Sequence, residues 1–165
     1  MTQLTYEGYG PGGVAILVET MTDNRNRTVA EVRHVFSRSG GNLGTDGSVS
    51  YLFDKKGQIL FAPGSNEEEV MEIAIESGAE DVITDEDGSI EVVALPESYL
   101  VVKDSLLAAD LEPDACQIAM VPQTYSDLDI DTGEKVLRLL DALEELDDVT
   151  SVYTNANFPK ELLKD

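Results

Sequence analysis

The sequence predicts an α+β fold of two units, in which a ferredoxin-like βαββαβ unit is inserted into a discontinuous α+β unit. Two hydrophobic periods alternate along its 165 residues: short period-2 runs, typical of strands, and longer runs with apolar residues three and four apart, typical of helices. Within residues 58–121 the elements follow the order β, α, β, β, α, β, which is the split βαβ pattern. Such a unit begins and ends on neighbouring strands, as an inserted domain requires. The expected domains are residues 1–57 with 122–165, and residues 58–121.

Strands are expected where apolar and polar residues alternate over short runs bounded by turn-forming residues. These runs fall at about residues 4–9, 14–20, 48–53, 58–62, 81–85, 89–95, 116–121 and 149–154. Asp87-Gly88 is typical of a tight hairpin turn, and residues 54–57 are typical of a longer one. The single cysteine, Cys116, lies in a run expected to be a buried strand, and a lone cysteine suits a reducing compartment.

The first helix is expected over residues 24–39, with its apolar face formed by Val29, Val32 and Phe36. Gly40-Gly41 follows this face and should end the helix. At 100° per residue, the opposite stripe of the helix is polar and partly basic. That stripe consists of Arg27, Glu31, His34 and Arg38.

The remaining helices are expected over residues 65–77, 97–110 and 131–146. The first of these should begin with a capping box made by Ser65 and Glu68. The last should be capped by Asp131, and it has the clearest apolar stripe in the chain. That stripe consists of Val136, Leu139, Leu140, Leu143 and Leu146.

Charge is unevenly distributed along the chain. The formal net charge is −22, from 11 basic and 33 acidic residues. Residues 1–56 contain six of each sign and sum to zero, whereas residues 57–165 contain five basic and 27 acidic residues and sum to −22. Most of the surface should therefore repel a polyanion, so that a nucleic acid is expected to bind only near residues 25–56. Solubility, including solubility in a salt-rich cell, is an alternative explanation for the acidity.

Gly8 to Gly13 match the dinucleotide fingerprint G-x-G-x-x-G, but the surrounding pattern argues against a nucleotide site. The fingerprint needs a helix after the glycines to receive the pyrophosphate, and here an apolar β-branched run over residues 14–20 follows instead. We therefore expect a glycine-rich bend between two strands, which either approaches a partner closely or serves only as a bend. The candidate contact loop consists of Tyr6, Gly8, Tyr9, Gly10, Pro11, Gly12 and Gly13.

No catalytic, metal or cofactor site is predicted. Residues 127–131 resemble the start of a calcium loop, but the EF-hand spacing requires Gly and Glu at the positions of Thr132 and Arg138. His34 is the single histidine, and no triad or zinc-binding set can be placed around it. Carboxylates are numerous, yet nothing in the sequence selects an acid–base pair. The sequence therefore favours a binding protein over an enzyme.

Basic residues near the N-terminus are the candidate contacts to a polyanion, since phosphate binding needs clustered positive charge. The alternative for this segment is a solvated helix face with a few salt bridges. The candidates are Arg25, Arg27, Arg33, Arg38, Lys55 and Lys56.

Three separated motifs, Leu4 to Gly13, Thr22 to Thr28 and Gly40 to Gly44, resemble those of the YebC/PmpR family. The motifs read LTYEGYGPGG, TDNRNRT and GGNLG, and the similarity runs from about residue 4 to residue 159. The resemblance implies a basic helical domain followed by two α+β domains, the last of them ferredoxin-like and inserted in the second. It also implies cytoplasmic DNA-binding regulators of transcription, or translational activators that act at the ribosome. The basic helical domain has no counterpart in these 165 residues, so we expect this chain to bind nucleic acid weakly.

The expected function is a non-enzymatic regulator of gene expression in the cytoplasm, acting without a cofactor through nucleic acid, the ribosome or both. No apolar run approaches the ~20 residues of a membrane span, and no signal peptide is recognisable, so no membrane partner is expected. The alternative is a protein- or small-ligand-binding regulatory module with no nucleic-acid contact, a role that ferredoxin-like folds often have. A contiguous positive surface would favour the first function, and a pocket with convergent polar groups the second.

Overall fold

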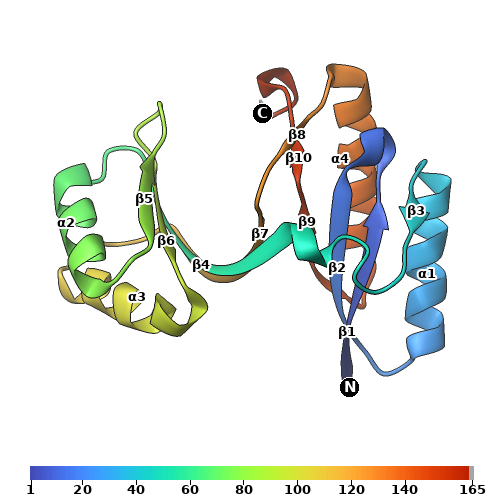
Figure 1. Ribbon diagram of the computed structural model, residues 1–165, viewed down its shortest axis with the longest axis horizontal. Helices are drawn as coiled ribbons and strands as arrows, with labels where there is room; N and C mark the ends of the chain where they lie inside the picture. The colour runs from blue at the N-terminus through green and yellow to red at the C-terminus, as the bar shows by residue number, and fades with distance from the viewer. Residues whose placement is uncertain (164–165) are drawn as a thin grey trace. The chain divides into compact units, whose positions relative to one another are not determined.

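The computed structural model describes residues 1–163 of the chain, and it confirms the predicted α+β class (Figure 1). Within the described residues, contacts divide the chain into two compact units. Unit 1 comprises Met1–Asp54 with Pro122–Asp165, and unit 2 comprises Lys55–Val121. Each unit encloses its own hydrophobic core. We propose that the units are separate domains, because a separate core is the physical requirement for folding as a domain.

The main sheet of unit 1 is antiparallel, with strand order β3-β1-β2-β9. Its strands are β1 (Thr2–Tyr9), β2 (Ala15–Thr22), β3 (Asn42–Leu43) and β9 (Val149–Thr154). β1 and β2 pair along their whole length, from Thr2 opposite Thr22 to Tyr9 opposite Ala15. A 3-10 turn, Pro11–Gly13, joins these two strands. The glycine-rich segment is therefore a bend between strands, as its sequence context predicts.

The helices α1 (Arg25–Arg38) and α4 (Ile130–Glu144) pack on one face of this sheet. Ile16 and Val18 of β2 contribute to the same core cluster as Phe36 of α1 and Leu139 of α4. The predicted apolar stripe of α4 supplies this contact, since Val136, Leu139 and Leu143 are buried and the other two members of the stripe pack against the cluster. The buried members of the cluster are Val14, Ile16, Val18, Val32, Val35, Phe36, Val136, Leu139, Leu143 and Ala156.

The ends of α1 are determined by local sequence. The side chain of Asn24 accepts a hydrogen bond from the backbone N–H of Arg27 at 3.1 Å, which satisfies one of the free donors of the first turn. At the other end, Gly40 has a φ of +82°. The N–H of Gly41 then donates to the carbonyl of Phe36 at 2.8 Å. The helix thus stops at a left-handed glycine, as predicted.

Unit 2 has the element order of the predicted ferredoxin-like βαββαβ unit (Figure 1). Its elements are β4 (Phe53–Phe61), α2 (Glu67–Ser77), β5 (Asp81–Thr84), β6 (Ile90–Ala94), α3 (Tyr99–Ala108) and β7 (Ala115–Pro122). The strands form a sheet of order β5-β6-β4-β7, in which β6 is antiparallel to both β4 and β5. Apolar residues of α2 and α3 pack against the sheet in the core of this unit, with Val70 and Val102 fully buried.

The strand predicted over residues 48–53 is wrong. Ser50–Leu52 forms a 3-10 turn, and the strand β4 begins at Phe53, so residues 54–57, predicted as a turn, lie inside β4. The physical cause is the buried carboxylate of Glu7, which accepts backbone hydrogen bonds from the 47–50 segment at 2.6–3.0 Å. Those N–H groups are consequently not available for a strand ladder.

Two predicted caps are displaced along the chain. At the start of α2, Asn66 accepts from the N–H of Glu69 at 3.2 Å, whereas the Ser65 hydroxyl donates to a loop carbonyl. At the start of α4, the cap is Asp129 and not Asp131, which lies in the first turn. In both places two residues no more than two positions apart have capping side chains, and local sequence did not distinguish between them.

Other differences concern burial and short elements. Val29 is half-buried, and Val35 completes the buried face of α1 instead. Cys116 is half-buried at the edge of the core of unit 2. The two-residue strands β3, β8 (Ser126–Asp127) and β10 (Ala156–Asn157) were not predicted, because two residues are too short to show a period. Among the described residues, no helix has the length and apolarity required to cross a membrane.

Candidate nucleic-acid interface

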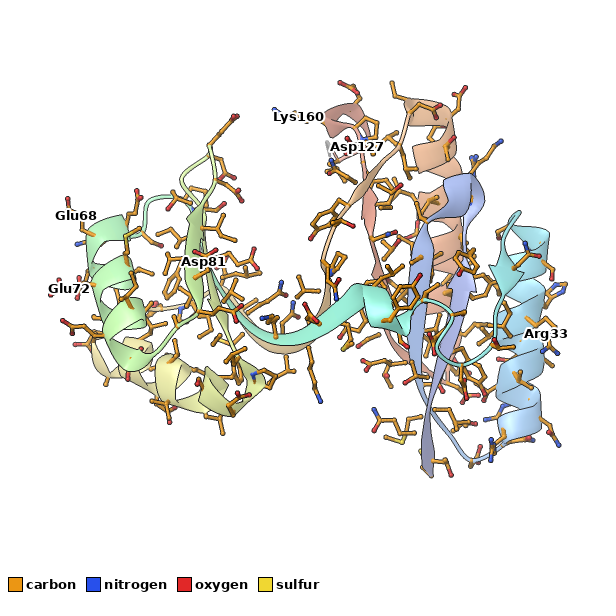
Figure 2. All side chains as sticks on the ribbon, in the orientation of Figure 1. Arg33, Glu68, Glu72, Asp81, Asp127 and Lys160 are labelled. Atoms are coloured by element: carbon orange, nitrogen blue, oxygen red, sulfur yellow. The ribbon has the colours of Figure 1, made fainter. Side chains whose placement is uncertain are left out.

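Arginines are distributed along the exposed surface of α1. Arg25, Arg33 and Arg38 are exposed, and within residues 1–163 none of them forms an ion pair. Arg33 projects from α1 into solvent (Figure 2). Because these guanidinium groups are not neutralised internally, their charge is available to an external anion.

Arg27, a further predicted contact, is instead held by carboxylates of the same chain. Its guanidinium lies 2.9 Å from Asp23 and 3.0 Å from Asp148. Asp148 also accepts from the hydroxyl of Thr28 at 2.7 Å, and this hydrogen bond, together with Arg27, holds the pKa of the Asp148 carboxyl below its usual range. These contacts tie the start of α1 to the loop after α4. We therefore expect Arg27 to hold α1 in place and not to contact a polyanion.

Lys55 and Lys56 belong to β4 and to unit 2, not to the helix that bears the arginines. The ammonium of Lys56 lies 2.6 Å from the carboxylate of Glu80, and 18% of its side chain is exposed. Lys55 is exposed. Of this pair, the structure leaves Lys55 as the better candidate for an external contact, since the charge of Lys56 is compensated.

A surface hollow of about 420 Å³ lies at the start of α1. It is lined by Tyr6, Arg25, Asn26 and Val29. Burial raises the pKa of the Tyr6 phenol, although the positive charge of Arg25 opposes this shift. The ring therefore stays neutral at physiological pH and presents an aromatic surface beside a cation. This combination suits a nucleobase and its phosphate.

A second hollow, of about 540 Å³, lies where the end of α1 meets α4. Its lining consists of Arg38, Ser39, Gly40, Lys135, Arg138 and Ala142. Lys135 and Arg138 were not predicted as contacts, because they lie in the strongly acidic part of the sequence. Their spacing of three residues on a predicted helix was the available signal, since it places both side chains on one face.

The candidate contact loop divides into buried and exposed parts. Gly8 and Gly10 are buried, Tyr6 and Pro11 are half-buried, and the remaining members are exposed. The hydroxyl of Tyr9 donates to the backbone carbonyl of Ser48 at 3.0 Å. The exposed members Tyr9, Gly12 and Gly13 stay the candidates for a close contact with a partner. Gly8 and Gly10 are closely packed, since a Cβ atom at either position would lie within 3.0 Å of a neighbouring side chain.

Replacing Gly8 by alanine should destabilise unit 1 by about 2 kcal/mol, through overpacking. A Cβ atom at this position would lie 2.7 Å from the carbonyl oxygen of Asn42 and 2.7 Å from the ring of Phe36. The control is Gly13→Ala, where a Cβ meets nothing within 4 Å and the cost, about 1 kcal/mol, comes from the positive φ. Urea unfolding would measure both variants. Equal destabilisation would show that Gly8 is not tightly packed.

Outside the arginines of α1, much of the surface is acidic. Glu68 and Glu72 of α2 and Asp81 at the start of β5 are exposed side chains of unit 2 (Figure 2). His34 is exposed on α1. Within residues 1–163, no group of three or more His, Cys, Asp or Glu side chains is placed to hold a metal ion. Polyanion contact is therefore best supported on the helices of unit 1.

Known proteins resemble this chain over nearly its whole length. A family model described as the second and third domain of TACO1/YebC matches residues 1–156. A "Probable transcriptional regulatory protein" of Hahella chejuensis is 61% identical over 162 residues, which cover 98% of this chain and 65% of the relative. The "Transcriptional regulatory protein PmpR" of Pseudomonas aeruginosa is 55% identical over 163 residues, which cover 99% of this chain and 66% of the relative. The chain thus spans just under two thirds of the length of these curated relatives.

A solved structure also resembles this chain. The crystal structure of a conserved hypothetical protein, Aq1575 from Aquifex aeolicus, matches with a TM-score of 0.86 and 47% sequence identity. The match covers 99% of this chain and 68% of the other. This similarity holds in both sequence and fold.

Proposed function

This chain belongs to the YebC/PmpR family, and we propose that it is a non-enzymatic, cytoplasmic regulator of gene expression that contacts nucleic acid, free or in the ribosome, through unit 1. Relatives that are more than half identical carry the name transcriptional regulatory protein. Because those relatives are longer than this chain, we assign to the 165 residues a contact surface and not the whole regulatory activity.

The observation that carries this proposal is the presence of uncompensated arginines on an acidic protein. With 33 acidic residues in the chain, a generic surface arginine has many carboxylates to pair with. Arg27 has such partners, whereas Arg25, Arg33 and Arg38 have no ion pair within residues 1–163. Guanidinium groups bind phosphate through parallel N–H donors, so an unpaired set on one helix suits a phosphate backbone.

The hollow at the start of α1 could bind a nucleobase next to this phosphate contact. The half-buried ring of Tyr6 and the guanidinium of Arg25 line the same hollow. Stacking of a base on an aromatic ring tolerates any sequence, because every base has a π-face. The surface therefore supports binding of a single-stranded or unpaired region more readily than reading of a duplex groove.

Removing two of these charges should weaken binding and reduce its salt dependence. For the Arg25→Gln/Arg33→Gln variant we expect an affinity for a single-stranded RNA lower by roughly tenfold, and a log–log salt slope smaller by about 1.4, since each lost phosphate contact removes about 0.7. Glutamine removes the charge and remains compatible with a helix. Fluorescence anisotropy at several salt concentrations would measure both quantities, with co-sedimentation testing ribosomes and a duplex testing DNA.

The matched control is Lys103→Gln/Lys160→Gln, which changes the net charge equally but lies outside α1 and its hollows. Binding by this control should equal that of the wild type. The proposal fails if the α1 variant and the control bind RNA, DNA and ribosomes equally well, or if no salt dependence is observed.

A second candidate function, a protein-binding module without nucleic-acid contact, is favoured by apolar side chains on the helices of unit 2. Ile75 of α2 and Leu100 and Val101 of α3 are 61%, 65% and 60% exposed. Adjacent exposed apolar residues of this size are a feature of protein-binding surfaces. Capture of the same protein partner by wild-type chain and by the Arg25→Gln/Arg33→Gln variant, after RNase and DNase treatment, would support this function. Loss of capture in Leu100→Ser would locate the partner on α3.

A further inference from the structure

Side chains from distant parts of the sequence meet in the hollow between α1 and α4. Arg38 is the last residue of α1, and Lys135 and Arg138 are about 100 residues further along the chain on α4. Small residues, Ser39, Gly40 and Ala142, complete the lining. The hollow of about 540 Å³ is therefore rich in cationic groups and has little bulk to fill it.

The positive charges of this hollow form no ion pair within residues 1–163, although the charge of Lys135 contributes to lowering the pKa of the Asp129 carboxyl. Lys135 and Arg138 lie on a helix that also carries Glu134 and Asp141, yet within the part of the chain that the structure describes they form no ion pair with these or other carboxylates. Arg38 likewise has none there. Like charges that share a surface repel one another, and a bound anion would relieve that repulsion.

The end of α1 does not itself oppose an anion strongly. Carbonyl groups at a helix C-terminus carry partial negative charge. Here the N–H of Ser39 donates to the carbonyl of Val35 at 3.1 Å, and the N–H of Gly41 donates to that of Phe36 at 2.8 Å. These bonds satisfy the carbonyl groups of Val35 and Phe36. Three full positive charges then outweigh the partial charge of about −0.5 at a helix C-terminus.

We propose that this hollow binds a phosphate group, and that the nucleic-acid contact of α1 thereby continues onto α4 through Arg38, Lys135 and Arg138. The proposal rests on the proposed function and extends it to residues that lie in the acidic part of the sequence. Two guanidinium forks and an ammonium suit phosphate oxygens, for which arginine supplies parallel donors and lysine a mobile point charge. The same chemistry would accept a phosphodiester of a nucleic acid or the phosphate of a free nucleotide.

The test uses the Lys135→Gln/Arg138→Gln variant of the full chain, beside Arg25→Gln/Arg33→Gln and the control Lys103→Gln/Lys160→Gln. Circular dichroism and urea unfolding would establish that all the variants fold. One arm measures anisotropy with a single-stranded RNA across salt concentrations. The other titrates inorganic pyrophosphate and ATP while the backbone amide signals of Ser39 and Gly40 are followed by NMR.

We expect the Lys135→Gln/Arg138→Gln variant to bind RNA roughly tenfold more weakly and with a salt slope smaller by about 1.4, as for two lost phosphate contacts. If the Gly40 signal shifts with RNA but not with pyrophosphate or ATP, the source of the phosphate is the polymer. Saturable shifts with pyrophosphate or ATP that are lost in this variant would support the site and assign a free phosphate ligand.

The two proposals can fail separately. The phosphate site in the hollow would be overturned if Lys135→Gln/Arg138→Gln binds RNA as the wild type does and no ligand shifts the Gly40 signal. If Arg25→Gln/Arg33→Gln binds RNA more weakly in the same experiment, the proposed function stands. The proposed function would be overturned if neither the wild type nor any variant binds RNA, DNA or ribosomes. If pyrophosphate still shifts the Gly40 signal, the phosphate site in the hollow stands. If neither polymer nor pyrophosphate binds, both are wrong.

Discussion

Replacing Glu7 by alanine is expected to lower the free energy of unfolding of unit 1 by about 3–5 kcal/mol. A hydrogen bond to a charged group contributes about 1.5–3 kcal/mol, and bonds to one carboxylate are coupled, so their loss is smaller than the sum. The Glu7 side chain lies on β1, and the residue is 7% exposed. Its carboxylate accepts from the N–H groups of Gly47, Val49 and Ser50 at 2.7, 3.0 and 2.6 Å. The variant would leave these donors without a partner. Urea unfolding would measure the loss, and hydrogen exchange at the Val49 and Ser50 amides would locate it.

The same carboxylate should make stability depend on pH. Burial alone would raise the pKa of Glu7, but the N–H groups of the 47–50 segment lower it by more, so its folded-state pKa lies below the ordinary value of about 4.3. A group of this kind stabilises the folded state above its unfolded pKa, and the contribution is lost as the pH falls through the folded pKa. We therefore expect the wild type to lose stability below about pH 4 more steeply than Glu7→Ala.

The control for this prediction is Glu134→Ala, at an exposed position on α4. An exposed substitution should change stability by no more than about 0.5 kcal/mol. If Glu7→Ala and Glu134→Ala unfold at the same urea concentration and with the same pH profile, the carboxylate does not hold the 47–50 segment in solution.

Truncation of Phe36 to alanine is expected to destabilise unit 1 by about 3–5 kcal/mol, the range for a buried aromatic residue. Phe36 is fully buried in the cluster that joins α1, α4 and the sheet. Its ring also packs against backbone: a Cβ atom added at Gly8 would lie 2.7 Å from the ring, and one added at Gly41 would lie 3.2 Å from it. The cavity would therefore open against backbone as well as side chains, and backbone closes over a void poorly.

The matched control for Phe36→Ala is Tyr51→Ala in the same unit, because Tyr51 is 68% exposed. We expect this change to shift stability by no more than about 0.5 kcal/mol. Thermal and urea unfolding would compare the two variants. A loss below about 1 kcal/mol in Phe36→Ala would mean that α1 is not packed on the sheet as the structure shows.

The spacing of apolar residues along the sequence was sufficient to identify the long helices. The stripe from Val136 to Leu146 predicted α4, and the pattern before Gly40 predicted α1 and its end. These features are encoded within single windows of the sequence, because the residues of one helix face recur every three or four positions. The order of elements over residues 58–121 likewise follows from local patterns, and it led to the ferredoxin-like unit.

Local sequence patterns gave a wrong prediction where the side chain of a distant residue binds the backbone. The period-2 run at residues 48–53 is typical of a strand, but the Glu7 carboxylate, about 40 residues away, binds its N–H groups and forms a turn. No window around residue 50 contains that information. The displaced caps at Asn66 and Asp129 have a different cause, since there the competing side chains lie one or two positions apart and are nearly equivalent as caps.

For the candidate interface, the sequence by itself determined that an acidic chain carries arginines on the exposed side of one helix. Tertiary structure alone decided which of them remain available. Asp148, 121 residues from Arg27, neutralises that arginine, and Lys135 and Arg138 join Arg38 because α4 packs beside the end of α1. The physical reason is that the spacing of apolar residues in the sequence shows which face of its own helix or strand a side chain occupies. The electrostatics of a site depend instead on which faces of different elements pack together.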